Sequence, residues 1–124
     1  MNKAEVIALA AEIEGAKYDF PFDEDFETVV FRHKDTGRWF GVVLAAPNDR
    51  IGVLPESGKS DVLNVKVPPE LGVLLKENYK SAADAYHMNK TLWISIVLGG
   101  DADGEIGKLL RLSFDLTEKR SKKR

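Results

Sequence analysis

Apolar and polar residues follow two different periods along the chain, and the period distinguishes expected helices from expected strands. Apolar positions three and four residues apart predict a helix between Asn2 and Gly15, with Glu5 as the acid of a capping box. The same spacing predicts a second helix after Pro68 and a third helix capped by Asp103. Three helices are therefore expected, one at each end of the chain and one in its second half.

Runs of β-branched and aromatic residues predict the strands of a sheet. They lie at residues 28–32, 38–44, 61–67 and 92–98, with a short additional strand at 51–54 as an open alternative. Gly37 supplies the positive φ of a tight hairpin, so the first two strands are expected to pair antiparallel. Phe20 and Phe22 flank a proline in an extended loop, and their rings are expected to plug one end of the core. The predicted order is helix, three or four strands, helix, strand, helix.

Alternation within these strands assigns one face to the helices and leaves the other face open. The expected core-facing residues are Phe40, Val42, Leu44, Leu63, Val65, Val67, Leu92, Ile94, Ile96 and Leu98. The opposite face would then present Arg32, Trp39, Val43, Asn64, Lys66, Trp93 and Ser95. Two tryptophans beside basic residues favour a recognition platform or an oligomer interface. The alternative is that the 46–60 loop or the C-terminal tail covers them.

Composition narrows the class of protein. A chain of 124 residues is one domain by length, and 44% hydrophobic with 31% charged residues is typical of a globular protein. The absence of cysteine excludes disulfides, thiolate nucleophiles and cysteine-ligated zinc. Acidic residues near the N-terminus do not fit a secretory leader, and no apolar run approaches the roughly 18 residues of a membrane span. The sequence therefore predicts a cytoplasmic protein without a membrane role.

Charge is distributed unevenly along the chain. The net charge is -2, yet five of the 18 basic residues fall in residues 119–124, which leaves 13 basic against 20 acidic residues, a net charge of -7, in residues 1–118. We therefore expect a single domain over 1–118 and a flexible basic tail over 119–124. A local acidic run from Asp19 to Glu27 contains no basic residue. Both runs are also consistent with solvated segments that bind nothing.

Several apparent motifs do not support catalysis or cofactor binding. Gly58-Lys59-Ser60 imitates the end of a phosphate-binding loop, but a strand follows where a helix must begin. Asp101 to Glu105 resembles the start of a calcium loop, but Ile106 stands where glycine is needed. Two histidines without carboxylates at ligand spacing predict no metal site. His87 could act as a general acid or base, but no nucleophile is legible beside it, so the prediction is no enzyme and no cofactor.

Blocks of residues from 20 to 116 resemble the MmcQ/YjbR-like family in order and spacing. The most specific block is Tyr86-His87-Met88-Asn89-Lys90 followed by Trp93; the weaker ones include Gly37-Arg38-Trp39-Phe40 and Leu112-Ser113-Phe114-Asp115-Leu116. The chain has Phe114 where tyrosine is common in the family and Leu92 where histidine is common. These departures weaken any chemistry expected at those two positions without affecting the fold.

The resemblance implies a fold and a possible partner. The implied fold is a two-layer α+β domain, an antiparallel sheet backed by helices, related in shape to secretion-chaperone-like folds. The family is commonly labelled DNA-binding, which implies DNA or single-stranded nucleic acid as a partner. The net charge of -7 over residues 1–118 opposes that label, because phosphate neutralisation drives such binding. The basic tail and the aromatic, basic sheet face favour it.

Three hypotheses from different functional classes remain. The first is a nucleic-acid-binding or regulatory domain, the second is a protein-interaction or homodimerisation module that uses the same face, and the third is a small-ligand binder or enzyme centred on His87. The candidate binding residues for the first two are Arg32, Trp39, Lys66, His87, Asn89, Lys90, Trp93, Lys119, Arg120, Lys122, Lys123 and Arg124. Asn89 is alternatively a structural residue of the turn.

Overall fold

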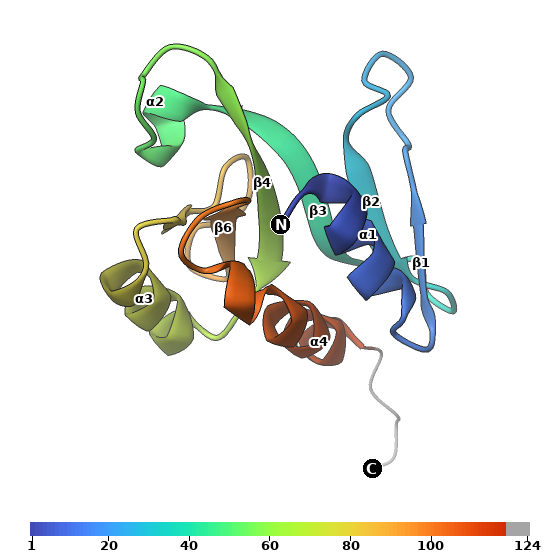
Figure 1. Ribbon diagram of the computed structural model, residues 1–124. Coiled ribbons are helices and arrows are strands. Elements are labelled where there is room, and N and C mark those ends of the chain that lie inside the picture. Colours follow the sequence, from blue (N-terminus) through green and yellow to red (C-terminus); the bar gives the residue numbers. More distant parts are fainter. Residues whose placement is uncertain (119–124) are drawn as a thin grey trace.

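The structure, a computed structural model, describes residues 1–118 and shows one sheet with the three longer helices packed on one face and a short helix on the other (Figure 1). In chain order the elements of this part are α1 (Lys3–Ala11), β1 (Ala16–Asp19), β2 (Val29–His33), β3 (Trp39–Pro47), α2 (Asn48–Ile51), β4 (Lys59–Lys66), α3 (Pro69–Asn78), β5 (Ala82–Asp84), β6 (Trp93–Val97), the 3-10 helix η1 (Asp103–Glu105) and α4 (Ile106–Thr117). The strands pair antiparallel in the order β1-β2-β3-β4-β6-β5. The predicted α+β class, an antiparallel sheet backed by helices, is confirmed.

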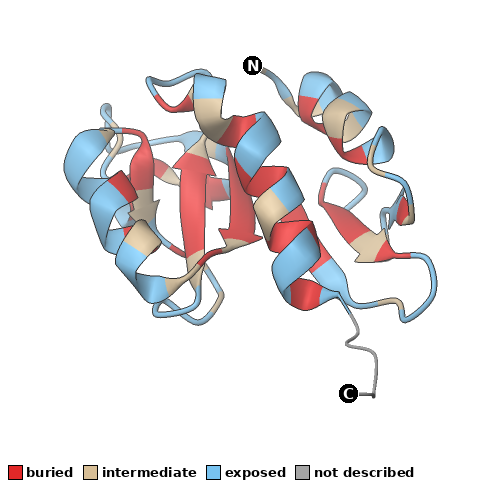
Figure 2. Cartoon of the chain, turned by 90° about the horizontal axis from the view of Figure 1, so that it is seen from below, coloured by how far each residue is buried: buried red, intermediate tan, exposed pale blue. Residues whose placement is uncertain are grey.

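The core lies between the sheet and helices α1, α3 and α4. Figure 2 shows buried residues along the inner side of α4 and on the strands beneath it. The largest fully buried side chains include Phe31, Phe40, Leu63 and Leu110. Helix α1 begins at the predicted capping box, in which the Asn2 side chain accepts from the Glu5 amide and the Glu5 side chain accepts from the Asn2 amide. Every helix within residues 1–118 is too short or too polar to span a bilayer.

Three local predictions are wrong. The segment expected as an optional strand at 51–54 is not a strand: it begins with the last residue of the short helix α2 (Asn48–Ile51), whose C-cap Gly52 has the left-handed conformation. Edge strands β1 and β5 were not expected, because each is only three or four residues long and pairs on one side. Phe20 and Phe22 do not plug the core; they are 43% and 42% exposed.

A β-bulge in β3 changes which residues face the core. Phe31 pairs with Gly41 whereas Arg32 pairs with Trp39, so Phe40 is an extra residue in β3. Phe40 and Gly41 consequently point to the same side, and a Cβ at Gly41 would lie only 2.9 Å from the Phe31 ring.

The bulge reverses the alternation that the sequence predicted for the rest of β3. Val43 belongs to the core cluster beneath the helices, although it was expected on the open face. Val42 and Leu44 were expected in that core, but they line a hollow on the open face.

A second, smaller cluster covers part of the open face. Ala46, Ile51 and Val62 are buried there, with Val53 and Tyr86 packed against them. The predicted alternative, in which the 46–60 loop covers this face, therefore holds for the end of the sheet nearest α2. Trp39 lies outside that cover and is 36% exposed, while Trp93 is half-buried.

Candidate functional site

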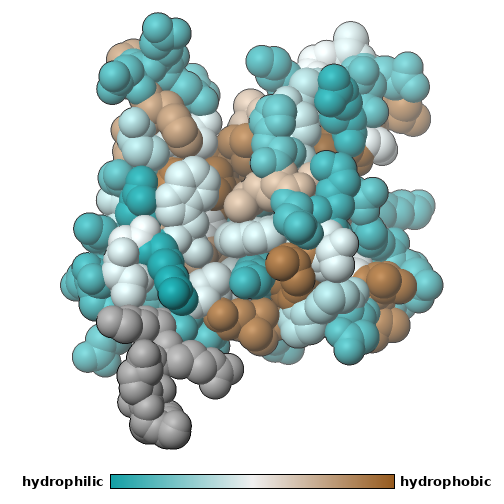
Figure 3. Space-filling view, turned by 180° about the vertical axis from the view of Figure 1, so that it is seen from behind, coloured by the Kyte–Doolittle hydropathy of each residue, from teal (hydrophilic) through white to brown (hydrophobic). Residues whose placement is uncertain are grey.

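The uncovered part of the open face is hollowed between two raised parts of the chain (Figure 3). The loop at 20–28 stands on one side, and α2 with the turn at 84–92 stands on the other. Hollows of about 590, 330 and 450 Å³ meet at Tyr86 and His87, which line all three. We call them the acidic hollow, the aromatic pocket and the basic hollow, respectively.

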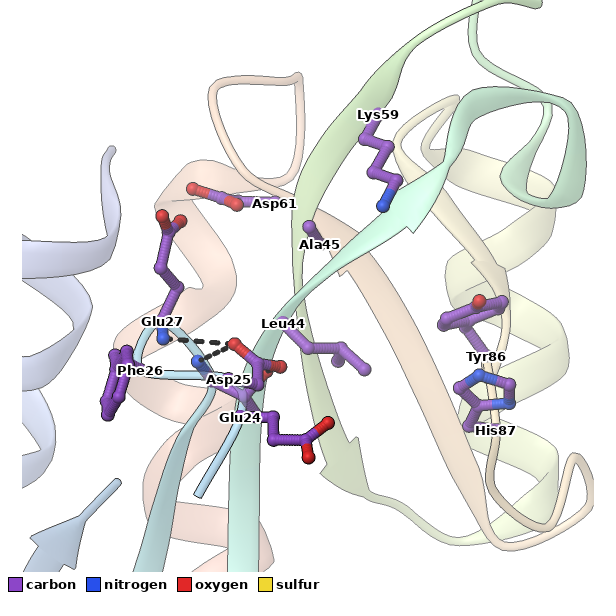
Figure 4. Close-up of a pocket in the computed structure, with 11 residues that line it drawn as sticks. Glu24, Asp25, Phe26, Glu27, Leu44, Ala45, Lys59, Asp61, Tyr86 and His87 are labelled. Atoms are coloured by element: carbon purple, nitrogen blue, oxygen red, sulfur yellow. Dashed lines mark hydrogen bonds between the residues drawn. The ribbon is translucent and has the colours of Figure 1, made fainter. Parts of the chain in front are cut away.

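The acidic hollow takes its name from the carboxylates around it. Its charged lining consists of Glu24, Asp25, Glu27, Asp61 and Lys59. Figure 4 shows Glu24, Glu27 and Asp61 on one side of the hollow, with Tyr86 and His87 across from them. Four carboxylates against one lysine give this surface a strongly negative potential.

The loop that carries the acids is held by Asp25. Its carboxylate accepts the hydroxyl of Thr28 and the amides of Glu27 and Thr28, the amide bonds measuring 3.0 and 3.2 Å. These bonds, the Thr28 hydroxyl first, lower the pKa of Asp25, so the carboxylate stays charged and the loop stays capped. Lys3 of α1 donates to the Glu27 carbonyl at 2.8 Å and ties the loop to the helix layer.

The aromatic pocket is lined mostly by apolar side chains of β3 and its neighbours. Phe22, Trp39, Val42, Leu44 and Met88 form its walls. The Phe22 and Trp39 rings meet edge to face at 6.4 Å between centroids, and the Arg32 guanidinium lies 5.6 Å from the centre of the Trp39 ring. Arg32 is therefore committed to Trp39 and, at 2.9 Å, to the carboxylate of Asp19.

A buried polar network fixes the turn that carries Tyr86 and His87. Asn64 donates to the Tyr86 carbonyl at 2.8 Å, the Tyr86 amide donates to the Ser95 hydroxyl at 2.9 Å, and that hydroxyl donates to the Asn64 side-chain oxygen. Asn64 and Ser95 are 1% and 0% exposed, although the alternation predicted both on an open face. The two side chains therefore hold the turn in place from the sheet beneath it.

His87 has an unusual backbone conformation. Its φ is +64°, in the left-handed region that side chains other than glycine rarely adopt. Its ring lies against the Tyr86 ring at 3.9 Å between centroids, and the residue is exposed where the three hollows meet. The turn thus presents His87 to solvent at the cost of local backbone strain.

Asn89 and Lys90 build the same turn. The Asn89 side-chain oxygen accepts the amides of Thr91 and Leu92 at 2.8 and 3.0 Å, and Lys90 donates to the Ala85 carbonyl at 2.9 Å. These contacts favour the structural alternative that the sequence left open for Asn89.

The remaining predicted residues fall into separate places. Trp93 lines a hollow of about 210 Å³ against α3, together with Lys76, Asp84 and Lys90, and it pairs in register with Lys66. Trp39 lies in the aromatic pocket instead, so the two tryptophans line different hollows. Lys119, Arg120, Lys122, Lys123 and Arg124 lie outside the described residues.

The potential metal ligands and the second histidine lie apart from one another in the structure. Residues 1–118 hold no group of three or more histidine or acidic side chains that could bind a metal. His33 is buried, with its ring stacked 4.1 Å from Phe114 and its Nε2 2.8 Å from the Thr117 hydroxyl. It belongs to the core and not to the site.

The sequence model of one family, YjbR, matches residues 11–116 of this chain. The Bacillus subtilis (strain 168) protein YyaQ, described as uncharacterized, is 33% identical over 119 residues, which cover 95% of this chain and 99% of that protein. A crystal structure of a Pseudomonas syringae protein is 34% identical, with a TM-score of 0.86 over 95% of this chain and all of the other. The Deinococcus radiodurans protein DR2400, a DUF419 domain, is 28% identical, with a TM-score of 0.71 over 96% of this chain and 81% of the other.

Proposed function

We propose that this chain, which belongs to the YjbR family, is a binding domain that holds a polypeptide segment in the hollows around His87. The family membership, predicted from the motif blocks, follows from the match over residues 11–116. The names of its relatives supply no ligand, so the proposal rests on the geometry and charge of the site.

The negative charge of the acidic hollow carries the proposal. Four carboxylates and one lysine line it, so phosphate groups brought onto this surface meet repulsion. A polypeptide segment does not carry that charge, and its backbone can lie along an open sheet face. The charge therefore favours the protein-interaction hypothesis over nucleic acid at this part of the face.

Exposed aromatic rings around the hollows support the same function. Phe26, on the rim of the acidic hollow, is 79% exposed, and Phe22, on the wall of the aromatic pocket, is 42% exposed. Aromatic side chains in a partly polar setting are typical of protein-binding surfaces. A segment that covers these rings would bury their apolar surface, and such burial contributes about 25 cal/mol of favourable binding free energy per Å².

The test is selection from a random peptide library displayed on phage, with the full chain as bait. Enriched peptides are synthesised, and their binding is mapped by amide and indole NMR shifts. We expect enriched peptides to shift the signals of Trp39, Tyr86 and His87. Failure to enrich any sequence, or enrichment of peptides that map elsewhere, would refute the proposal.

A second candidate, binding of single-stranded nucleic acid, is favoured by the surroundings of Trp93. Lys66, Lys76 and Lys90 lie around this indole, with Asp84 as the acid of the Trp93 hollow. Stacking of a base on an aromatic side chain is worth about 1–3 kcal/mol, and the half-buried Trp93 indole leaves part of its ring open to such contact. Fluorescence anisotropy with single-stranded DNA at low salt tests it.

In a chain that ends at Glu118, Trp93→Ala should weaken the binding of single-stranded DNA by about 1–3 kcal/mol. If removal of residues 119–124 abolishes binding altogether, the tail alone accounts for it.

A further inference from the structure

We infer that the bound segment is basic and carries an apolar anchor: an aromatic or aliphatic side chain enters the aromatic pocket while neighbouring lysine or arginine side chains lie in the acidic hollow. This inference rests on the proposed function and names the chemistry of its ligand.

The aromatic pocket has few free polar groups to offer a ligand. Asn64 is bonded to the Tyr86 carbonyl and to Ser95, and Asp25 is bonded to Thr28 and Glu27. The apolar walls remain, in a volume of about 330 Å³, at the lower end of the range of ligand sites in proteins. A polar side chain placed against these walls would lose water and find partners only at Tyr86 and His87, so the pocket favours an apolar one.

The acidic hollow offers unengaged acceptors. Within residues 1–118, the carboxylates of Glu24, Glu27 and Asp61 make no hydrogen bond and no ion pair, unlike that of Asp25. Ammonium and guanidinium groups are the side-chain donors that match several free carboxylates. Phe26 beside them can pack on the apolar stem of a lysine or arginine, because long basic side chains bury their stems on apolar surface.

Both subsites belong to one continuous surface. The acidic hollow and the aromatic pocket share Asp25, Thr28, Leu44, Tyr86 and His87. Their floors follow β3 from Trp39 to Ala45, which spans about 20 Å at roughly 3.3 Å per residue. One extended segment of about six residues therefore reaches both, and its anchor and cations are only a few residues apart.

The charge of the surface on either side of His87 also determines where the basic residues of the ligand lie. On the other side of His87, the basic hollow is lined by Arg50, Lys90 and Asp84. The sign of the surface thus changes across His87, so the basic part of the ligand lies toward the loop at 20–28 and away from α2.

Four synthetic heptapeptides on a serine background test the inference with the full chain. One contains a phenylalanine and two lysines; the others replace both lysines by glutamine, both lysines by glutamate, or the phenylalanine by alanine. Each is made in both sequence directions and titrated by NMR at low and at physiological salt. The alanine-lysine peptide also represents residues 119–124, which are basic and contain no apolar anchor.

We expect the phenylalanine-lysine peptide to bind at least about tenfold more tightly than each of the other three, and to weaken as salt rises. Glu24→Gln with Glu27→Gln should reduce its affinity several-fold and leave the phenylalanine-glutamine peptide unaffected. Glu14→Gln with Glu77→Gln is the matched control, because both residues are exposed acids away from the hollows, and it should change neither affinity.

The outcomes separate this inference from the proposed function. If the glutamine or the alanine-lysine peptide binds the hollows as tightly as the phenylalanine-lysine peptide, the inference is wrong and the proposed function stands. If library-selected peptides also leave the signals of Trp39, Tyr86 and His87 unmoved, both are wrong.

Discussion

Removal of the Asn64 side chain should both destabilise the fold and loosen the turn at Tyr86. In Asn64→Ala, the Tyr86 carbonyl loses its 2.8 Å bond and the Ser95 hydroxyl loses its acceptor, in a place where Asn64 is 1% exposed. A buried polar group left without a partner costs about 1–3 kcal/mol. Two groups lose a partner in this variant, but water can reach the turn from the side of the hollow and satisfy them in part. We therefore expect the free energy of unfolding to fall by about 2–4 kcal/mol.

Urea denaturation followed by tryptophan fluorescence and by far-UV circular dichroism measures this loss. A double-mutant cycle with Ser95→Ala isolates the network, since each single variant already breaks the shared hydrogen bond. The double variant should be less destabilised than the sum of the two singles by about 1 kcal/mol. A loss below about 0.5 kcal/mol for Asn64→Ala, or strict additivity in the cycle, would refute the network as the anchor of the turn.

The remaining predictions concern the turn, the bulge and the buried histidine. Asn89→Ala should lower the free energy of unfolding by about 1–3 kcal/mol, with ligand binding changing only in step with it; lost binding at an unchanged melting temperature would make Asn89 a contact residue. Gly41→Ala should destabilise by about 1–3 kcal/mol through its clash with the Phe31 ring, whereas Gly107→Ala, which meets nothing within 4 Å, should be neutral or stabilising in the same urea assay. Burial lowers the pKa of His33 from 6.5, so as pH falls the unfolded chain binds a proton at this histidine before the folded chain does. The stability that neutral His33 contributes is therefore complete above pH 6.5 and is lost as pH falls toward the folded-state pKa. His33→Gln should flatten the stability profile in that range; a slope as steep as that of the unsubstituted chain would contradict this assignment.

The fold class could be predicted because its signals are local. Helix α1 has both partners of its capping box within three residues, and α4 repeats apolar residues over 12 residues. Strands β1 and β5 escaped prediction because four and three residues give alternation too little length to register. Gly41 within a strand run was the available signal for a bulge, and ignoring it put Val42 and Val43 on the wrong faces.

The sequence showed the segments that form the site but not that they meet. The acidic run from Asp19 to Glu27 and the turn at His87 were both visible, but their meeting in one hollow depends on contacts between segments some 60 residues apart in the chain. Asn64 and Ser95 read as surface residues by alternation, because no pattern reveals that the turn above them supplies their hydrogen-bond partners. The separation of Trp39 from Trp93 likewise depends on the position of α3 beside β6.

The order of the strands in the sheet affects how the chain folds during its synthesis on the ribosome. Strand β6 lies between β4 and β5, so the last strand within residues 1–118 inserts into the interior of the sheet and not at its edge. The amide of Tyr86 is hydrogen-bonded to the hydroxyl of Ser95 in β6. A nascent chain that lacks β6 therefore has the acidic loop and β3, but the turn that carries Tyr86 and His87 has lost this bond. The proposed binding surface is therefore complete only after β6 has been synthesised and paired, and a nascent chain that stops before β6 leaves the apolar edge of β4 exposed.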